Sequence, residues 1–141
     1  MGFTAQDSSS NSVGILTVWN SSMFKLLYSI KHEGFMAAMG PWQGNNSKLG
    51  VLNIYAPQNA RCKRTLWKNI VRVLQMNSKV SWVVCREFNE VRAADERKGT
   101  TYDPLSTRHF NFFISSAGLT EIRLGGRKFT WLNSDCSLAL D

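Results

Sequence analysis

Hydrophobic and polar positions change their spacing partway along the chain. Up to Pro57 the apolar residues form short runs separated by turn-forming residues, which is typical of β-strands. Short strands with brief turns predict a meander, and the polar start of the chain, residues 1–12, predicts a flexible leader. The expected strands cover residues 13–19, 24–30, 35–39 (strand or helix by spacing alone) and 48–55.

The spacing becomes helical after Pro57. Leu66, Ile70 and Leu74 recur three to four residues apart, which predicts an amphipathic helix over about residues 61–76. We expect its outer face to carry five basic residues: Arg61, Lys63, Arg64, Lys68 and Arg72.

The apolar run at residues 81–85 is short and continuous, as in a buried central strand. Asp103-Pro104 predicts the start of a second helix, with Asp as the cap, and Gly118 predicts its end. Two further short strands are expected at residues 119–122 and 128–132. This order predicts a mixed α/β or α+β fold, and a length of 141 residues predicts one domain, over residues 13–141.

The charge distribution adds a candidate partner. The net charge is +7, of which residues 1–60 contribute +1 and residues 61–141 contribute +6. A basic surface of this kind favours a polyphosphate partner such as DNA or another nucleic acid, because each neutralised phosphate releases counterions. The alternative is a solvated basic surface without a partner. No apolar run reaches the ~18 residues of a membrane span, and no signal peptide is evident. We therefore expect an intracellular protein, nuclear or cytoplasmic, that does not bind membranes.

Candidate chemistry follows the strand predicted at residues 81–85. The two-residue period of a strand directs Glu87 and Asn89 to the same side and Phe88 to the other. A carboxylate beside an amide suits the binding of Mg²⁺ or of a water molecule near a phosphate. The three cysteines are far apart in sequence, which predicts free thiols and neither a disulfide framework nor a zinc site.

Several blocks resemble, in order, the endonuclease/exonuclease/phosphatase (DNase-I-like) family, and most closely the endonuclease domain of plant LINE-type retrotransposons. The resemblance covers about residues 14–141. Its blocks are Gly14-Ile15-Leu16 with Trp19-Asn20, Leu52-Asn53-Ile54-Tyr55-Ala56-Pro57, Lys63-Arg64 with Leu66-Trp67, Trp82-Val83-Val84-Cys85-Arg86-Glu87-Phe88-Asn89-Glu90-Val91-Arg92, Glu96-Arg97-Lys98-Gly99, Phe110-Asn111-Phe112-Phe113-Ile114, Ala117-Gly118-Leu119 and Leu124-Gly125-Gly126-Arg127-Lys128-Phe129-Thr130-Trp131.

The resemblance implies a two-sheet sandwich flanked by helices and a Mg²⁺-dependent hydrolysis of phosphodiesters, which in retroelements nicks target DNA. Tyr55 matches the family's active-site Tyr, and Glu87 stands where the family has a metal-site Asp. Asn89 matches the Asn two residues later, and Asp141 matches the Asp of a Leu-Asp-Arg block.

Departures from the family pattern imply a degenerate site. The family's metal-binding Glu and closing His are not found in this chain, and neither His32 nor His109 matches that His. Arg86 replaces Gly and places a cation where a cation should bind. Glu87 replaces Asp and displaces its carboxylate by roughly 1–1.5 Å, and a misplacement of ~1 Å can cost about 10²-fold in rate. We expect a domain truncated at both ends, with exposed sheet edges that favour self-association.

Three functions follow from this reading. The first is an inactive remnant of a retroelement endonuclease. The second is a non-catalytic nucleic-acid-binding module. The third is a residual nuclease complemented by another chain, with Mg²⁺ held by Glu87, Asn89 and Asp141. The binding residues of the second would be Arg61, Arg64, Lys68, Arg97, Lys98, Arg127 and Lys128.

Overall fold

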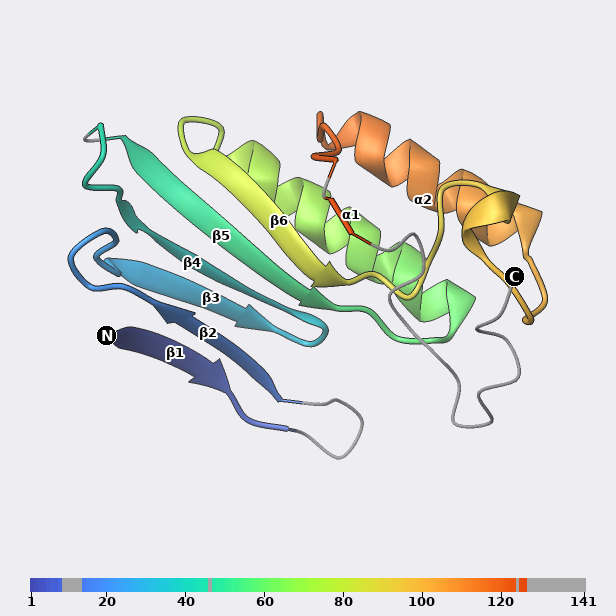
Figure 1. The fold of residues 1–141 in the computed structure, drawn as a ribbon, viewed down its shortest axis with the longest axis horizontal. Helices are drawn as coiled ribbons and strands as arrows, with labels where there is room; N and C mark the ends of the chain where they lie inside the picture. Colours follow the sequence, from blue (N-terminus) through green and yellow to red (C-terminus); the bar gives the residue numbers. More distant parts are fainter. Residues whose placement is uncertain (9–13, 46, 124, 127–141) are drawn as a thin grey trace. The chain divides into compact units, whose positions relative to one another are not determined.

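The computed structural model describes residues 1–8, 14–45, 47–123 and 125–126. The chain divides into two compact units, Met1–Asn89 and Glu90–Asp141 (Figure 1). The described part contains two sheets and two helices, so the predicted mixed α+β class is confirmed. That both units belong to the single domain expected over residues 13–141 stays a prediction.

The first unit contains a two-stranded sheet, a four-stranded sheet and one long helix in its described residues. Its elements, in chain order, are β1 (Gly2–Gln6), β2 (Ile15–Trp19), β3 (Tyr28–His32), β4 (Phe35–Pro41), β5 (Lys48–Tyr55), α1 (Ala60–Met76) and β6 (Ser81–Glu87).

The four-stranded sheet has the order β3-β4-β5-β6. β3, β4 and β5 form an antiparallel meander, as predicted, and β6 joins β5 in parallel after the crossover through α1. β4 is buried along most of its length, because it lies inside the sheet and is covered on both faces. The ambiguous residues 35–39 therefore form a strand.

The helix α1 covers one face of this sheet. Its apolar residues Leu66, Trp67 and Ile70 are buried. Leu66 packs beside the β3–β4 turn. Gly34 in this turn has φ +85°, a backbone conformation that residues other than glycine rarely adopt. The helix predicted over residues 61–76 is thus confirmed, and its N-cap is Asn59, whose Oδ1 accepts a hydrogen bond from the Cys62 amide.

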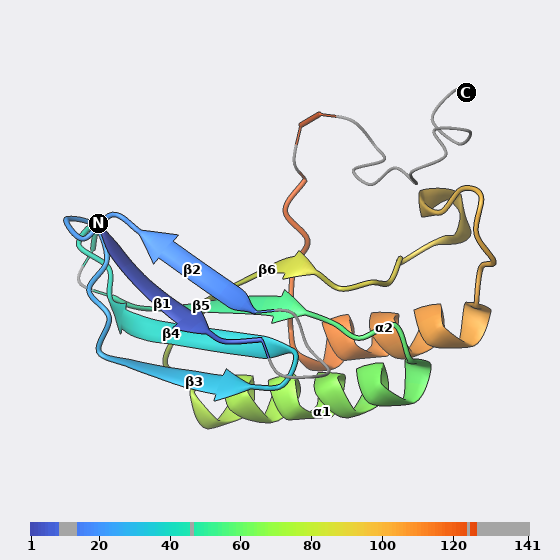
Figure 2. The ribbon, with the colours of Figure 1, turned by 90° about the horizontal axis from the view of Figure 1, so that it is seen from below.

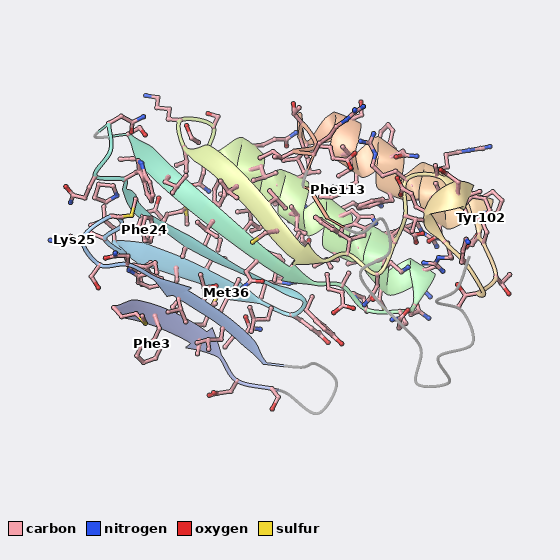
Figure 3. The ribbon with its side chains drawn as sticks, viewed as in Figure 1. Phe3, Phe24, Lys25, Met36, Tyr102 and Phe113 are labelled. Atoms are coloured by element: carbon pink, nitrogen blue, oxygen red, sulfur yellow. The ribbon has the colours of Figure 1, made fainter. Side chains whose placement is uncertain are left out.

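The β1–β2 pair covers the opposite face (Figure 2). The Thr4 hydroxyl on β1 lies 3.8 Å from the sulfur of Met36 on β4. Met36 is labelled in Figure 3. Asn53 on β5 donates hydrogen bonds to β2. The expected flexible leader is therefore wrong for Gly2–Gln6. These residues gain a hydrogen-bonding partner in β2, a long-range contact that local composition does not reveal.

Two strand predictions require correction. β6 pairs only with β5 within the described residues and leaves Val83 44% exposed, so it is not a central strand there. An apolar run predicts burial but does not identify the neighbours that would provide it. The strand expected at residues 24–30 begins only at Tyr28, because Phe24 makes an isolated bridge to Trp42 instead.

The second unit contains a short 3₁₀ helix, η1 (Ala94–Glu96), and the helix α2 (Pro104–Ser116). Asp103 caps α2 by accepting a hydrogen bond from the Leu105 amide, as predicted. The expected strand at residues 119–122 is wrong, because the Leu119 amide donates back to Ile114 and completes the helix end after Gly118 (φ +65°). Residues 128–132 lie outside the described residues.

Candidate functional site

The parallel pairing of β5 with β6 brings two candidate residues together. Tyr55 and Glu87 are register partners at the carboxyl ends of these strands. The Ala56 amide donates to the Glu87 carbonyl at 2.9 Å and extends the pairing by one residue. Parallel register partners project from the same face of a sheet, so the phenol and the carboxylate start from neighbouring positions on one face.

Asn89 lies just beyond this pair and holds the two strand ends together. Its backbone is in the left-handed region (φ 50°), which Asn tolerates better than most residues. Its side-chain amide donates to the carbonyl of Ala56. Because β6 ends at Glu87, the strand alternation that predicted a common side for Glu87 and Asn89 stops before Asn89. Phe88 contacts the ring of Trp67, with centroids 6.2 Å apart, which agrees with its predicted core-facing role.

Lys63 is a site residue that the sequence reasoning placed wrongly. It is only 6% exposed, and its ammonium group donates to the Asn89 carbonyl at 2.7 Å. It therefore lies on the inner face of α1 and not on the outer face as expected. The signal was present, because Lys63 precedes Leu66 by three residues and Trp67 by four, the spacing of one helix face.

The described residues supply few of the expected Mg²⁺ ligands. Among them, no three His, Cys, Asp or Glu side chains come close enough to share a metal. The strand ends provide the exposed carboxylate of Glu87. The side chain of Asn89 donates a hydrogen bond through Nδ2 to the Ala56 carbonyl, and its Oδ1 is the atom that a metal ion would contact. Asp141, the other expected ligand, lies outside the described residues.

The predicted nucleic-acid-binding residues belong to different parts of the chain. Arg61 and Lys68 are exposed on α1, and Arg64 is half-buried there. Arg97 and Lys98 belong to the second unit, directly after η1. The remaining two, Arg127 and Lys128, lie outside the described residues.

The remaining candidate side chains have ordinary structural roles. His32 stacks on Phe35 with ring centroids 4.9 Å apart, and its Nδ1 lies 2.9 Å from the Glu33 carbonyl. Neither Cys62 nor Cys85 forms a disulfide, as predicted for these two. In the second unit Arg92 forms an ion pair with Glu121 at 3.0 Å and a hydrogen bond to Asn111.

No protein-family model matches the chain, and no curated protein shows significant similarity to it. The likeness to the endonuclease/exonuclease/phosphatase family thus stays a prediction. Neither α1 nor α2, the described helices of the chain, combines the length and the apolar character needed to cross a bilayer.

Proposed function

We propose that the chain is a catalytically inactive derivative of a Mg²⁺-dependent endonuclease of the endonuclease/exonuclease/phosphatase type, of the kind carried by plant LINE-type retroelements. The observation that supports this best is the pairing of Tyr55 with Glu87 at the ends of two parallel strands. Asn89 follows directly and is bonded to Ala56. A phenol, a carboxylate and an amide thus come from the sequence blocks that carry the resemblance.

One feature of the strand ends supports inactivity. The pair Arg86-Glu87 replaces the Gly-Asp of the family block and moves the carboxylate by roughly one methylene length. Mg²⁺ requires near-ideal octahedral geometry and binds poorly where carboxylates are misplaced.

A plasmid-nicking assay tests the inactivity. Supercoiled DNA incubated with the purified chain and Mg²⁺ or Mn²⁺ should not be nicked above the level seen with the Glu87→Ala variant. Nicking by the unaltered chain that disappears with EDTA and in Glu87→Ala would overturn this part of the proposal.

A repaired block tests the family assignment itself. The double variant Arg86→Gly/Glu87→Asp should bind Mn²⁺ about tenfold more tightly than the unaltered chain, a gain of roughly 1.4 kcal/mol, because it removes the positive charge that precedes Glu87 in the sequence and shortens the carboxylate arm. Isothermal titration calorimetry measures the affinity. Lys79→Gly, which removes an exposed cation from a turn, is the matched control. Equal affinities for the repaired and control variants would contradict a metal site at these strand ends.

A further inference from the structure

The two units differ completely in net charge. The unit Met1–Asn89 contains ten basic and three acidic residues, a net charge of +7. The unit Glu90–Asp141 contains seven of each and is neutral. The whole net positive charge of the chain therefore resides in the first unit, and half of that unit's basic residues are on α1. α1 itself contains no acidic residue.

Four of the five basic residues of α1 form one stripe on the helix surface, which we call the α1 stripe: Arg61, Arg64, Lys68 and Arg72. At about 100° per residue they fall within a sector roughly 80° wide. The buried residues Leu66, Ile70 and Leu74 centre about 160° away, on the face that packs against the sheet. The fold thus directs the stripe to solvent and retains Lys63 inside.

The α1 stripe is not neutralised by the described part of the chain. None of its members forms an ion pair with a described carboxylate. Cations three and four residues apart on a helix repel one another and destabilise it slightly. An external polyanion would relieve this repulsion.

We propose that the α1 stripe is a binding surface for the phosphate backbone of duplex DNA. The proposal does not rest on the proposed function, because it needs neither a metal ion nor hydrolysis. The segment of residues 61–72 is about 16 Å long. One strand of a duplex presents a phosphate charge about every 3.4 Å along the axis, so each of the four cations can meet a separate phosphate.

The neighbours of the stripe favour a duplex over other polyanions. Single-stranded nucleic acids are usually bound with stacking aromatic side chains, and Trp67, the aromatic residue of α1, is buried. Membrane-surface helices insert an exposed apolar face beside their cations. The apolar face of α1 is instead packed against the sheet. Arginine and lysine side chains without exposed aromatic residues beside them are typical of contacts to the phosphates of a nucleic-acid backbone.

Fluorescence anisotropy with a labelled 20-base-pair DNA of mixed sequence, in EDTA, tests the proposal. Four phosphate contacts predict a slope of about −3.6 in a plot of log K against log[KCl], or roughly a 10²-fold loss of affinity between 50 and 200 mM KCl. The triple variant Arg61→Gln/Lys68→Gln/Arg72→Gln should lose at least about tenfold in affinity for this DNA at 50 mM KCl. The slope of its salt dependence should fall to about −1. Gln is a good helix former, and circular dichroism checks that α1 is retained.

A charge-matched variant separates the stripe from general basicity. Lys25→Gln/Lys31→Gln/Lys79→Gln removes the same charge from exposed positions of the same unit outside α1. It should retain affinity within about threefold and keep the steep salt slope. Equal losses in both triple variants would overturn the proposal. So would tighter binding to single-stranded DNA, to duplex RNA or to vesicles containing 30% phosphatidylserine than to duplex DNA.

Discussion

The four-stranded sheet is covered by α1 on one face and by the β1–β2 pair on the other, and these two covers expose different side chains to solvent. On one face α1 packs its apolar residues inward and presents cations outward. On the other face the β1–β2 pair is apolar outside as well: Phe3, Leu16 and Val18 are 71%, 55% and 50% exposed. These three lie on neighbouring strands, because Phe3 is the register partner of Val18 and Leu16 precedes Val18 by two residues on β2.

The two covers also differ in what they bury. Beneath α1 the contacts are mostly apolar, whereas β1–β2 is attached partly through the amide of Asn53. The Nδ2 of Asn53 donates to Leu16 and Thr17, but its Oδ1 is buried without a partner in the described structure. The helix thus covers a mostly apolar core and presents cations to solvent. The β1–β2 cover combines polar anchoring inside with an apolar row outside.

The largest expected effect concerns the helix side of this comparison. Ile70→Ala removes a fully buried side chain between α1 and the sheet and should lower the free energy of unfolding by about 2–5 kcal/mol. Denaturant titration measures it. Val18→Ala, on the exposed row, should cost less than ~0.5 kcal/mol. Similar costs for both substitutions would break the distinction between the covers.

A smaller effect is expected where the β1–β2 pair is anchored. Asn53→Leu should cost about 1–2 kcal/mol, because the Leu16 carbonyl loses its side-chain donor while removal of the unpartnered Oδ1 offsets part of the loss. Hydrogen exchange should accelerate first in β1 and β2. Thr17→Val, which removes one acceptor of the same amide, is the milder control. A more stable Asn53→Leu protein would mean that the amide does not anchor the pair.

The smallest effect on stability, with a clear effect on association, is expected on the apolar row. Phe3→Ser/Val18→Lys should change the unfolding free energy by less than ~0.5 kcal/mol and reduce concentration-dependent self-association in analytical ultracentrifugation, because it interrupts a contiguous apolar surface. Phe112→Ser, at a position 73% exposed on α2, is the control. If Phe112→Ser reduces self-association as much as Phe3→Ser/Val18→Lys does, the apolar row on β1 and β2 is not the contact surface.

Local signals in the sequence predicted local structure well. The spacing of Leu66, Ile70 and Leu74 located α1, and Asp103-Pro104 located the start of α2, because each depends on residues within a few turns of one another. Pairing between distant segments was not accessible in this way. Nothing in Gly2–Gln6 indicates its antiparallel partner, and the run at Ser81–Glu87 gives no information on its position within the sheet.

At the candidate site, too, local features were predicted and long-range pairing was not. Glu87 and Asn89 were identified from their position after a strand, but their common side was inferred from an alternation that ends at Glu87. The register that places Tyr55 beside Glu87 depends on the parallel crossover, which local spacing does not specify. Lys63 was misplaced because charge was given more weight than helical position, although a lysine with a nearby carbonyl can be buried.

The distribution of charge along α1 has a consequence for the order in which this protein acquires its structure. The first turn contains Arg61 and Lys63 and no acid, and the last turn contains no base, so the macrodipole is uncompensated at both ends. As a free peptide this segment would remain largely a random coil, because its nucleation cost would have no electrostatic compensation. We expect α1, the longest regular element of the described residues, to become stable only as it packs against the sheet.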